Sequence, residues 1–143
     1  MHGHLVMLST NMFSQSLSMS YMFGTDGRIF TNRSGMPLYQ LNRDLCYYYG
    51  INEVSFGITV PEGFITDLAS IPRLPFIYLI LNGVADMPGV LHDYLYSCGK
   101  YDRAECDKIF LDAMLSIGIS KWKAYAIYTG VRLFGASHYN TDM

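Results

Sequence analysis

The 143-residue sequence predicts an α+β fold, with an N-terminal antiparallel β-sheet followed by about four C-terminal helices. Three observations predict it. Up to about residue 70, short aromatic or β-branched runs alternate with turn residues, whereas apolar residues recur at helical spacing beyond it. The helical segments also have capping residues at their starts and glycines at their ends. We expect a single domain over 1–143, β-rich at 23–69 and helical at 70–136.

The β-rich part contains the expected strands, which are residues 38–41, 45–49 and 54–60. Residues 24–27 are expected to form one turn. Residues 60–63 are expected to form another, because Pro61 and Gly63 occupy the second and fourth places of a type I turn. Residues 1–22 are rich in Met and Ser and have no regular period. We interpret them as an N-terminal arm that contacts a partner.

Four helices are expected in the second half, at residues 70–82, 87–98, 102–117 and 120–135. The first opens with a cap-like Ser70 and a proline suited to a first turn, and it ends near Asn82. Asp102 and Glu105 form a capping box for the third. The last should mainly close the core.

Composition excludes several function classes. The net charge is −2 with dispersed basic residues, which argues against nucleic acid as a partner. The three cysteines, an odd number without metal-ligand spacing, predict a reducing compartment. No signal peptide is recognisable at the start, and the most apolar run, residues 76–81, is too short for a membrane span.

The strongest candidate site is His92-Asp93 on the second expected helix, together with Asp107 on the third. Asp107 lies three, four and seven residues before Phe110, Leu111 and Met114, so it continues their apolar face and should point inward. A buried carboxylate needs a partner. His92 on the preceding helix is the most natural donor, with Tyr94, Tyr96 and Arg73 as competitors, which predicts an antiparallel helix pair joined by polar residues.

Each candidate residue has a structural interpretation beside the catalytic one. His92, Asp93 and Asp107 form either a water-activating site or a buried cluster that pins two helices together. Asp67 and Arg73 are expected to make an ion pair or a cap at the strand-to-helix corner, although Arg73 is also suited to a phosphate. Ser70 fits a helix cap better than a nucleophile backed by His92 and Asp107.

Several blocks of the sequence together resemble a known protein family. The blocks are residues 57–73, Leu91-His92-Asp93-Tyr94-Leu95-Tyr96, Asp107 and residues 131–135. In this order, over residues 28–135, they resemble domain of unknown function 1353, a family of bacteriophages and prophages. The resemblance implies a phage setting, in the host cytoplasm during infection or in the virion, with other phage proteins or further copies of the chain as partners. It implies no activity.

The helix pair is also similar to the core of phospholipases A2, which share His-Asp-x-x-Tyr on one helix and an aspartate on the next. This resemblance implies that His92 activates water, Asp93 holds calcium, Asp107 orients the imidazole and Tyr96 buttresses the pair, with a lipid or another ester as substrate. The glycine-rich calcium loop and the disulfides of those enzymes are missing. Asp67, or backbone carbonyls around Leu68 and Ala69, would complete the metal site instead, within a loop that also contains Thr66 and Ser70.

Three function classes therefore stay open. The first is a small hydrolase with a His/Asp dyad. The second is a non-enzymatic virion component, in the tail or neck, whose polar cluster is structural. The third is a metal phosphohydrolase of the HD type, which Leu91-His92-Asp93 also resembles. This third class is disfavoured because the only upstream histidines, His2 and His4, precede a β-rich half.

Overall fold

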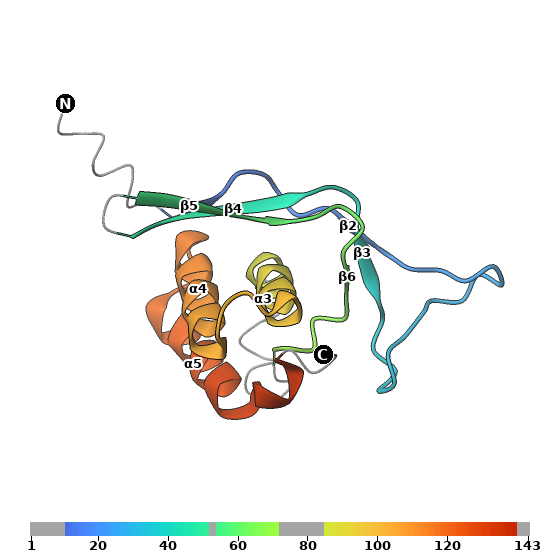
Figure 1. The fold of residues 1–143 in the computed structure, drawn as a ribbon. Coiled ribbons are helices and arrows are strands. Elements are labelled where there is room, and N and C mark those ends of the chain that lie inside the picture. Colours follow the sequence, from blue (N-terminus) through green and yellow to red (C-terminus); the bar gives the residue numbers. More distant parts are fainter. Residues whose placement is uncertain (1–10, 52–53, 72–84, 140–143) are drawn as a thin grey trace.

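The computed structural model describes residues 11–51, 54–71 and 85–139. Antiparallel strands from the N-terminal half lie over a group of three helices from the C-terminal half, which confirms the predicted α+β class (Figure 1). None of the helices in this described part of the chain is both long enough and apolar enough to cross a bilayer.

The larger sheet covers the helices. Its strand order is β1 (Met12–Phe13), β4 (Leu45–Ile51) and β5 (Val54–Val60), with β4 and β5 paired along their full length. The predicted strands at 45–49 and 54–60 are thereby confirmed, the first extended by two residues. Side chains alternate between the faces of a strand, so Tyr47 and Val60 point into the core and are fully buried.

The smaller sheet positions the loop that leads to the site. It has the order β2 (Met19–Tyr21), β3 (Tyr39–Leu41) and β6 (Ile65–Thr66), all antiparallel. Between β2 and β3 the chain makes a projecting excursion over residues 22–38 (Figure 1), including the expected turn at 24–27, which Gly27 closes with a hydrogen bond to Gly24. Within the arm expected over 1–22, residues 11–22 contain β1 and β2, and residues 1–10 lie outside the described part.

The turn between β5 and β6 differs by one residue from the sequence prediction. The backbone N–H of Phe64 donates to the carbonyl of Pro61, so the turn spans residues 61–64 instead of 60–63. Gly63 then occupies the third place with a φ of 88°. A positive φ at that place is a feature of a type II turn and is strained for residues with a Cβ, which explains the glycine.

Three of the four expected helices are found among the described residues. They are α3 (Asp86–Cys98), α4 (Arg103–Ser116) and α5 (Lys121–Phe134). Asp102 caps α4 by accepting a hydrogen bond from the Glu105 N–H, as the capping box predicts, and Gly99 ends α3 in the left-handed conformation. The first expected helix, at 70–82, falls almost wholly in residues 72–84, outside the described part.

The core lies between the larger sheet and the three helices. α4 packs against both α3 and α5, and α3 also contacts β5 and β6. The largest apolar side chains that are fully buried come from the sheet and from all three helices, namely Tyr47, Leu45, Leu91, Leu95, Tyr96, Phe110, Met114 and Ile127. Two polar side chains, those of His92 and Asp107, are also fully buried here. Burial of such groups is costly unless each is hydrogen-bonded, so their partners define the site.

Candidate functional site

Asp107, on the inner face of α4, is a fully buried carboxylate with partners on three helices. Its Oδ1 accepts hydrogen bonds from His92 Nε2 (2.7 Å) and the Tyr96 hydroxyl (2.6 Å), both on α3. Its Oδ2 accepts from Arg132 at 2.6 Å, on α5, and lies 3.5 Å from Arg103. Arg103 also donates to the carbonyls of Val131 and Arg132, at 3.2 and 3.1 Å. The carboxylate therefore joins α3, α4 and α5 at one point.

His92 is held between this carboxylate and the loop after β6. Its ring lies between the rings of Tyr96 and Phe110, with centroids 4.1 and 4.6 Å away. While Nε2 faces Asp107, Nδ1 lies 2.9 Å from the Ser70 hydroxyl oxygen. Because a carboxylate can only accept, Nε2 carries the proton. Nδ1 is then unprotonated, and it can take the proton of the Ser70 hydroxyl once that hydroxyl turns its single hydrogen from Asp93 to Nδ1.

Asp93, the next residue on α3, contacts the same loop after β6. It accepts hydrogen bonds from the Thr66 hydroxyl, the Ser70 hydroxyl and the Ser70 backbone N–H, the last at 3.1 Å. Ser70 Oγ therefore contacts both His92 and Asp93. A continuous series of hydrogen bonds runs from Asp93 through Ser70 and His92 to Asp107.

The loop that carries Ser70 is strained and densely hydrogen-bonded. Leu68 has a φ of 59°, in the left-handed region that is costly for a residue with a side chain. Its N–H donates to Thr66 Oγ1 at 3.1 Å, and the Ala69 N–H donates to Asp67 Oδ1 at 2.9 Å. Asp67 Oδ2 accepts from Asn32 at 2.8 Å. Strain that the surroundings hold in place in this way is a feature of functional sites.

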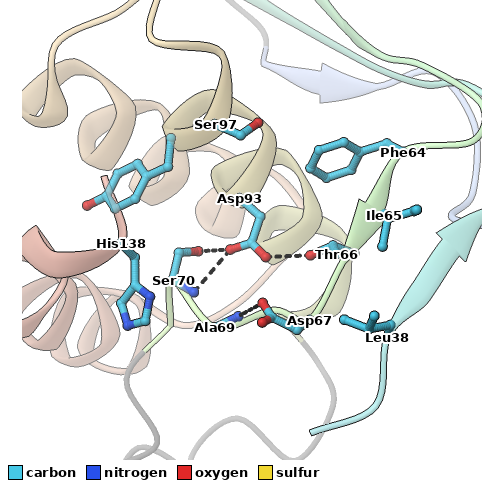
Figure 2. Close-up of a pocket in the computed structure, with 11 residues that line it drawn as sticks. Leu38, Phe64, Ile65, Thr66, Asp67, Ala69, Ser70, Asp93, Ser97 and His138 are labelled. Atoms are coloured by element: carbon cyan, nitrogen blue, oxygen red, sulfur yellow. Dashed lines mark hydrogen bonds between the residues drawn. The ribbon is translucent and has the colours of Figure 1, made fainter. Parts of the chain in front are cut away.

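A pocket opens over this loop, with a volume of about 330 Å³. Figure 2 shows Ser70 and Asp93 on its wall, with His138 to one side and the apolar side chains of Leu38, Phe64 and Ile65 to the other. Thr66, Asp67, Ala69, Tyr96 and Ser97 complete the lining. His92 and Asp107 do not line the pocket, so Ser70 and Tyr96 are the links between the pocket and the buried cluster.

Burial and hydrogen bonding shift the pKa values of Asp107 and Asp93 in opposite directions. Burial alone would raise the pKa of Asp107, but hydrogen bonds from His92, Tyr96 and Arg132 outweigh it and lower the pKa below its usual value. For Asp93, burial dominates and raises the pKa, although the hydrogen bonds from Ser70 and Thr66 oppose the change. Two neighbouring carboxyls with pKa values pushed apart are a frequent property of acid–base sites.

The donor set does not fit calcium as the phospholipase resemblance implies. Calcium takes six to eight oxygen ligands. Both oxygens of Asp93 already accept hydrogen bonds from Thr66 and Ser70. Over the described ranges, no three His, Cys, Asp or Glu side chains gather closely enough to hold a metal ion. The metal roles of Asp93 and Asp67 therefore stay predictions.

The structure brings most of the sequence-predicted site residues together. His92 contacts Asp107, the inward position of Asp107 is confirmed, and Tyr96 binds the same carboxylate. The Ser70 hydroxyl bonds Asp93 and His92, and the helix that we expected it to cap falls outside the described residues. Arg73, His2 and His4 lie outside the described residues. Arg132 and Arg103 were not predicted from the sequence as partners of Asp107. Arg103 could have been found, because it precedes Asp107 by four residues, a helical spacing that favours an ion pair.

Comparison with known proteins gives one family. A family model described as protein of unknown function (DUF1353) matches residues 39–131, which is more than half of the 143 residues. The chain belongs to this family. The match includes Thr66, Ser70, His92, Asp93 and Asp107, so most of the hydrogen-bonded site lies within the family domain. Neither the curated proteins nor the solved structures gave a significant match to the chain.

We expect Asp107→Asn to lower the free energy of unfolding by about 3 kcal/mol or more, measured by urea denaturation at neutral pH. The substitution removes the negative charge from a buried site and places an amide among donors, so the Arg132 guanidinium loses its partner. Asp112→Asn on the same helix is the matched control. Its ion pair with Lys108 lies at the surface, with Lys108 exposed and Asp112 half-buried, so the loss should stay below about 1 kcal/mol.

The stability difference between the wild type and Asp107→Asn should depend on pH. Because the pKa of Asp107 is lowered in the folded protein, its contribution is complete above the unfolded pKa of about 3.9 and is lost as the pH falls through the folded pKa. The difference between the wild type and Asp107→Asn should therefore shrink as the pH falls below about 4. An equal loss in both variants, or a difference independent of pH, would contradict the role assigned to Asp107.

Proposed function

We propose that the protein is a small hydrolase of ester or amide bonds in which Ser70 is the nucleophile, His92 the base and Asp107 the group that orients His92. The observation that carries this proposal is the hydrogen-bonded series at the pocket wall. Ser70 Oγ lies 2.9 Å from His92 Nδ1, and His92 Nε2 lies 2.7 Å from Asp107 Oδ1. Only the serine of the three lines the pocket, where a substrate carbonyl can reach it.

The proposed reaction has two steps. Ser70 Oγ attacks the carbonyl carbon and transfers its proton to His92 Nδ1, which then protonates the leaving group as an acyl-serine forms. Water attacks the acyl group, gives a proton to His92 and releases the acid, and the proton returns to Ser70. His138, exposed on the pocket wall, is the donor that we assign to the carbonyl oxygen.

The proposal changes the mechanism that the phospholipase resemblance implies. There, His92 would activate water directly and Asp93 would hold calcium. In the proposed mechanism the Ser70 hydroxyl lies beside Nδ1 of His92, and Asp93 accepts a hydrogen bond from the backbone N–H of this serine. Asp93 becomes a positioning residue, because it accepts hydrogen bonds from the Thr66 hydroxyl and from the backbone N–H of Ser70.

The residues that line the pocket also indicate which class of substrate fits it. Asp67 and Asp93 line it, and an apolar wall faces them. Two carboxyl groups disfavour a phosphate beside the reacting bond, because like charges repel. We therefore propose an uncharged ester or amide as substrate in preference to the phospholipid that the resemblance implies. The phage setting, with a location in the host cytoplasm or the virion, is proposed from the family resemblance alone.

We expect Ser70→Ala to reduce hydrolysis of a short-chain p-nitrophenyl ester by about 100-fold or more, because the attacking oxygen is removed. The assay includes a chelator, since no metal takes part in the proposed steps. Ser97→Ala is the control. Ser97 lines the same pocket, but its hydroxyl bonds the Tyr94 carbonyl and not His92, so activity should stay within about twofold.

Labelling provides a second readout for the same variants. A fluorophosphonate should modify Ser70 in the wild type and in Ser97→Ala, and mass spectrometry of peptides should locate the adduct. A wild-type protein that neither hydrolyses the ester nor reacts with the probe would refute the hydrolase proposal. Modification of a different serine would refute the role of Ser70.

A non-enzymatic virion component is the second candidate, and one observation favours it. The segment at residues 22–38, which projects from the body in Figure 1, exposes large apolar side chains. Phe23, Ile29 and Phe30 are 59%, 41% and 48% exposed. Exposed apolar groups on a projecting segment are typical of surfaces that a neighbour covers in an assembly. In that case the cluster around Asp107 would serve only to join the helices.

A further inference from the structure

Strand β5 leaves one edge of the larger sheet without a partner strand in the described part of the chain. All seven residues of β5 pair with β4 on one side, and the strand order places β5 at the end of the sheet. Figure 1 shows β5 beside β4 in the layer above the helices. Gly57 and Thr59 near its middle are exposed.

The register identifies the backbone groups at this open edge. The carbonyl of Cys46 on β4 accepts a hydrogen bond from the Ser14 N–H, so Cys46 directs its backbone toward the β1 side. Backbone directions alternate along an antiparallel strand, so Tyr47 directs its own backbone toward β5 and its partner Ile58. By the same alternation, Ser55, Gly57 and Thr59 direct their N–H and C=O groups away from the sheet.

Two features that often keep edge strands from pairing with other chains, charged side chains and proline, are absent from β5 itself. Residues 54–60 contain no charged residue and no proline. A seven-residue strand of this composition is a ready template for a further strand. Residues 54–60 are uncharged and are matched in kind about Gly57, with Val54 answered by Val60, Ser55 by Thr59 and Phe56 by Ile58. An identical antiparallel strand therefore meets similar side chains without repulsion, so a second copy of this chain is the partner that fits.

We propose that two copies of the protein associate through β5, antiparallel about a two-fold axis at Gly57, so that two three-stranded sheets become one continuous sheet. This register gives complete overlap of residues 54–60, with residue 55 of each copy opposite residue 59 of the other. It pairs the outward groups of Ser55, Gly57 and Thr59 with one another.

The side chains near the axis are compatible with this pairing. On the outer face, Gly57 has no side chain, and the Tyr48 ring occupies the space where a Cβ would lie. On the face toward the helices, Phe56 is 43% exposed although its ring stacks on Tyr49. The register puts Phe56 opposite Ile58 of the second copy, and an aromatic side chain opposite a β-branched one is a favourable cross-strand pair.

Sedimentation velocity over about 1 to 500 µM tests the proposal, because an interface made mainly by one strand is small and its affinity moderate. We expect the wild type to dimerise with rising concentration. Ser55→Lys/Thr59→Lys places like charges directly opposite each other and should weaken dimerisation by about tenfold or more. Ser55→Lys/Thr59→Glu places opposite charges there and should restore dimerisation.

The charge-swapped variant is the matched control for folding, because it changes the same two positions. Far-UV circular dichroism should be the same for all three proteins. A wild type that stays monomeric throughout would overturn the proposal, as would a double-lysine variant that dimerises as strongly as the wild type. Equally weak dimerisation of both variants would overturn the antiparallel register at Gly57. None of these outcomes depends on enzymatic activity.

Discussion

The folded helices and the candidate site both depend on Asp107. A fully buried carboxylate is tolerated only when strong donors replace the water that it loses, and here they come from α3, α4 and α5. The positive charges of Arg103 and Arg132 compensate the carboxylate, and Arg103 also ties the end of α5 to α4. Because one group fixes three helices, any chemistry that uses His92 begins from a preorganised imidazole.

A second constraint connects this cluster to the pocket. His92 and Asp93 are consecutive residues of α3, so they diverge around the helix and reach different targets. His92 reaches inward to Asp107, whereas Asp93 faces the loop after β6, and Ser70 touches both. The left-handed Leu68 and the turn bonds of Thr66 and Asp67 hold that loop in one conformation. The serine is thus fixed by the sheet on one side and by the helices on the other.

The sequence allowed the three described helices to be predicted well, because their signals are local. Apolar periodicity placed Asp107 on the inner face of α4, and capping residues located the helix ends. The same reasoning was less successful where contacts join distant segments. Arg132 reaches Asp107 across 25 residues, and no local pattern marks it as a partner. Ser70 was interpreted as a cap from its neighbour Pro72, whereas its contacts with α3 depend on how the β6 loop packs against that helix. The turn at Pro61 was predicted one residue too early, because proline and glycine are favoured in both type I and type II turns but at different places.

The proposed mechanism depends on which nitrogen of His92 carries the proton, because Nε2 donates to Asp107 and Nδ1 must stay free to take the proton of the Ser70 hydroxyl. Long-range ¹H–¹⁵N NMR of the histidine rings near neutral pH measures it most directly, with His92→Gln identifying the signals. We expect Nε2 of His92 to carry the proton and Nδ1 to have the shift of an unprotonated, hydrogen-bonded nitrogen. A proton on Nδ1 would contradict the proposed mechanism, because His92 would then donate to Ser70 and could not remove the proton of its hydroxyl.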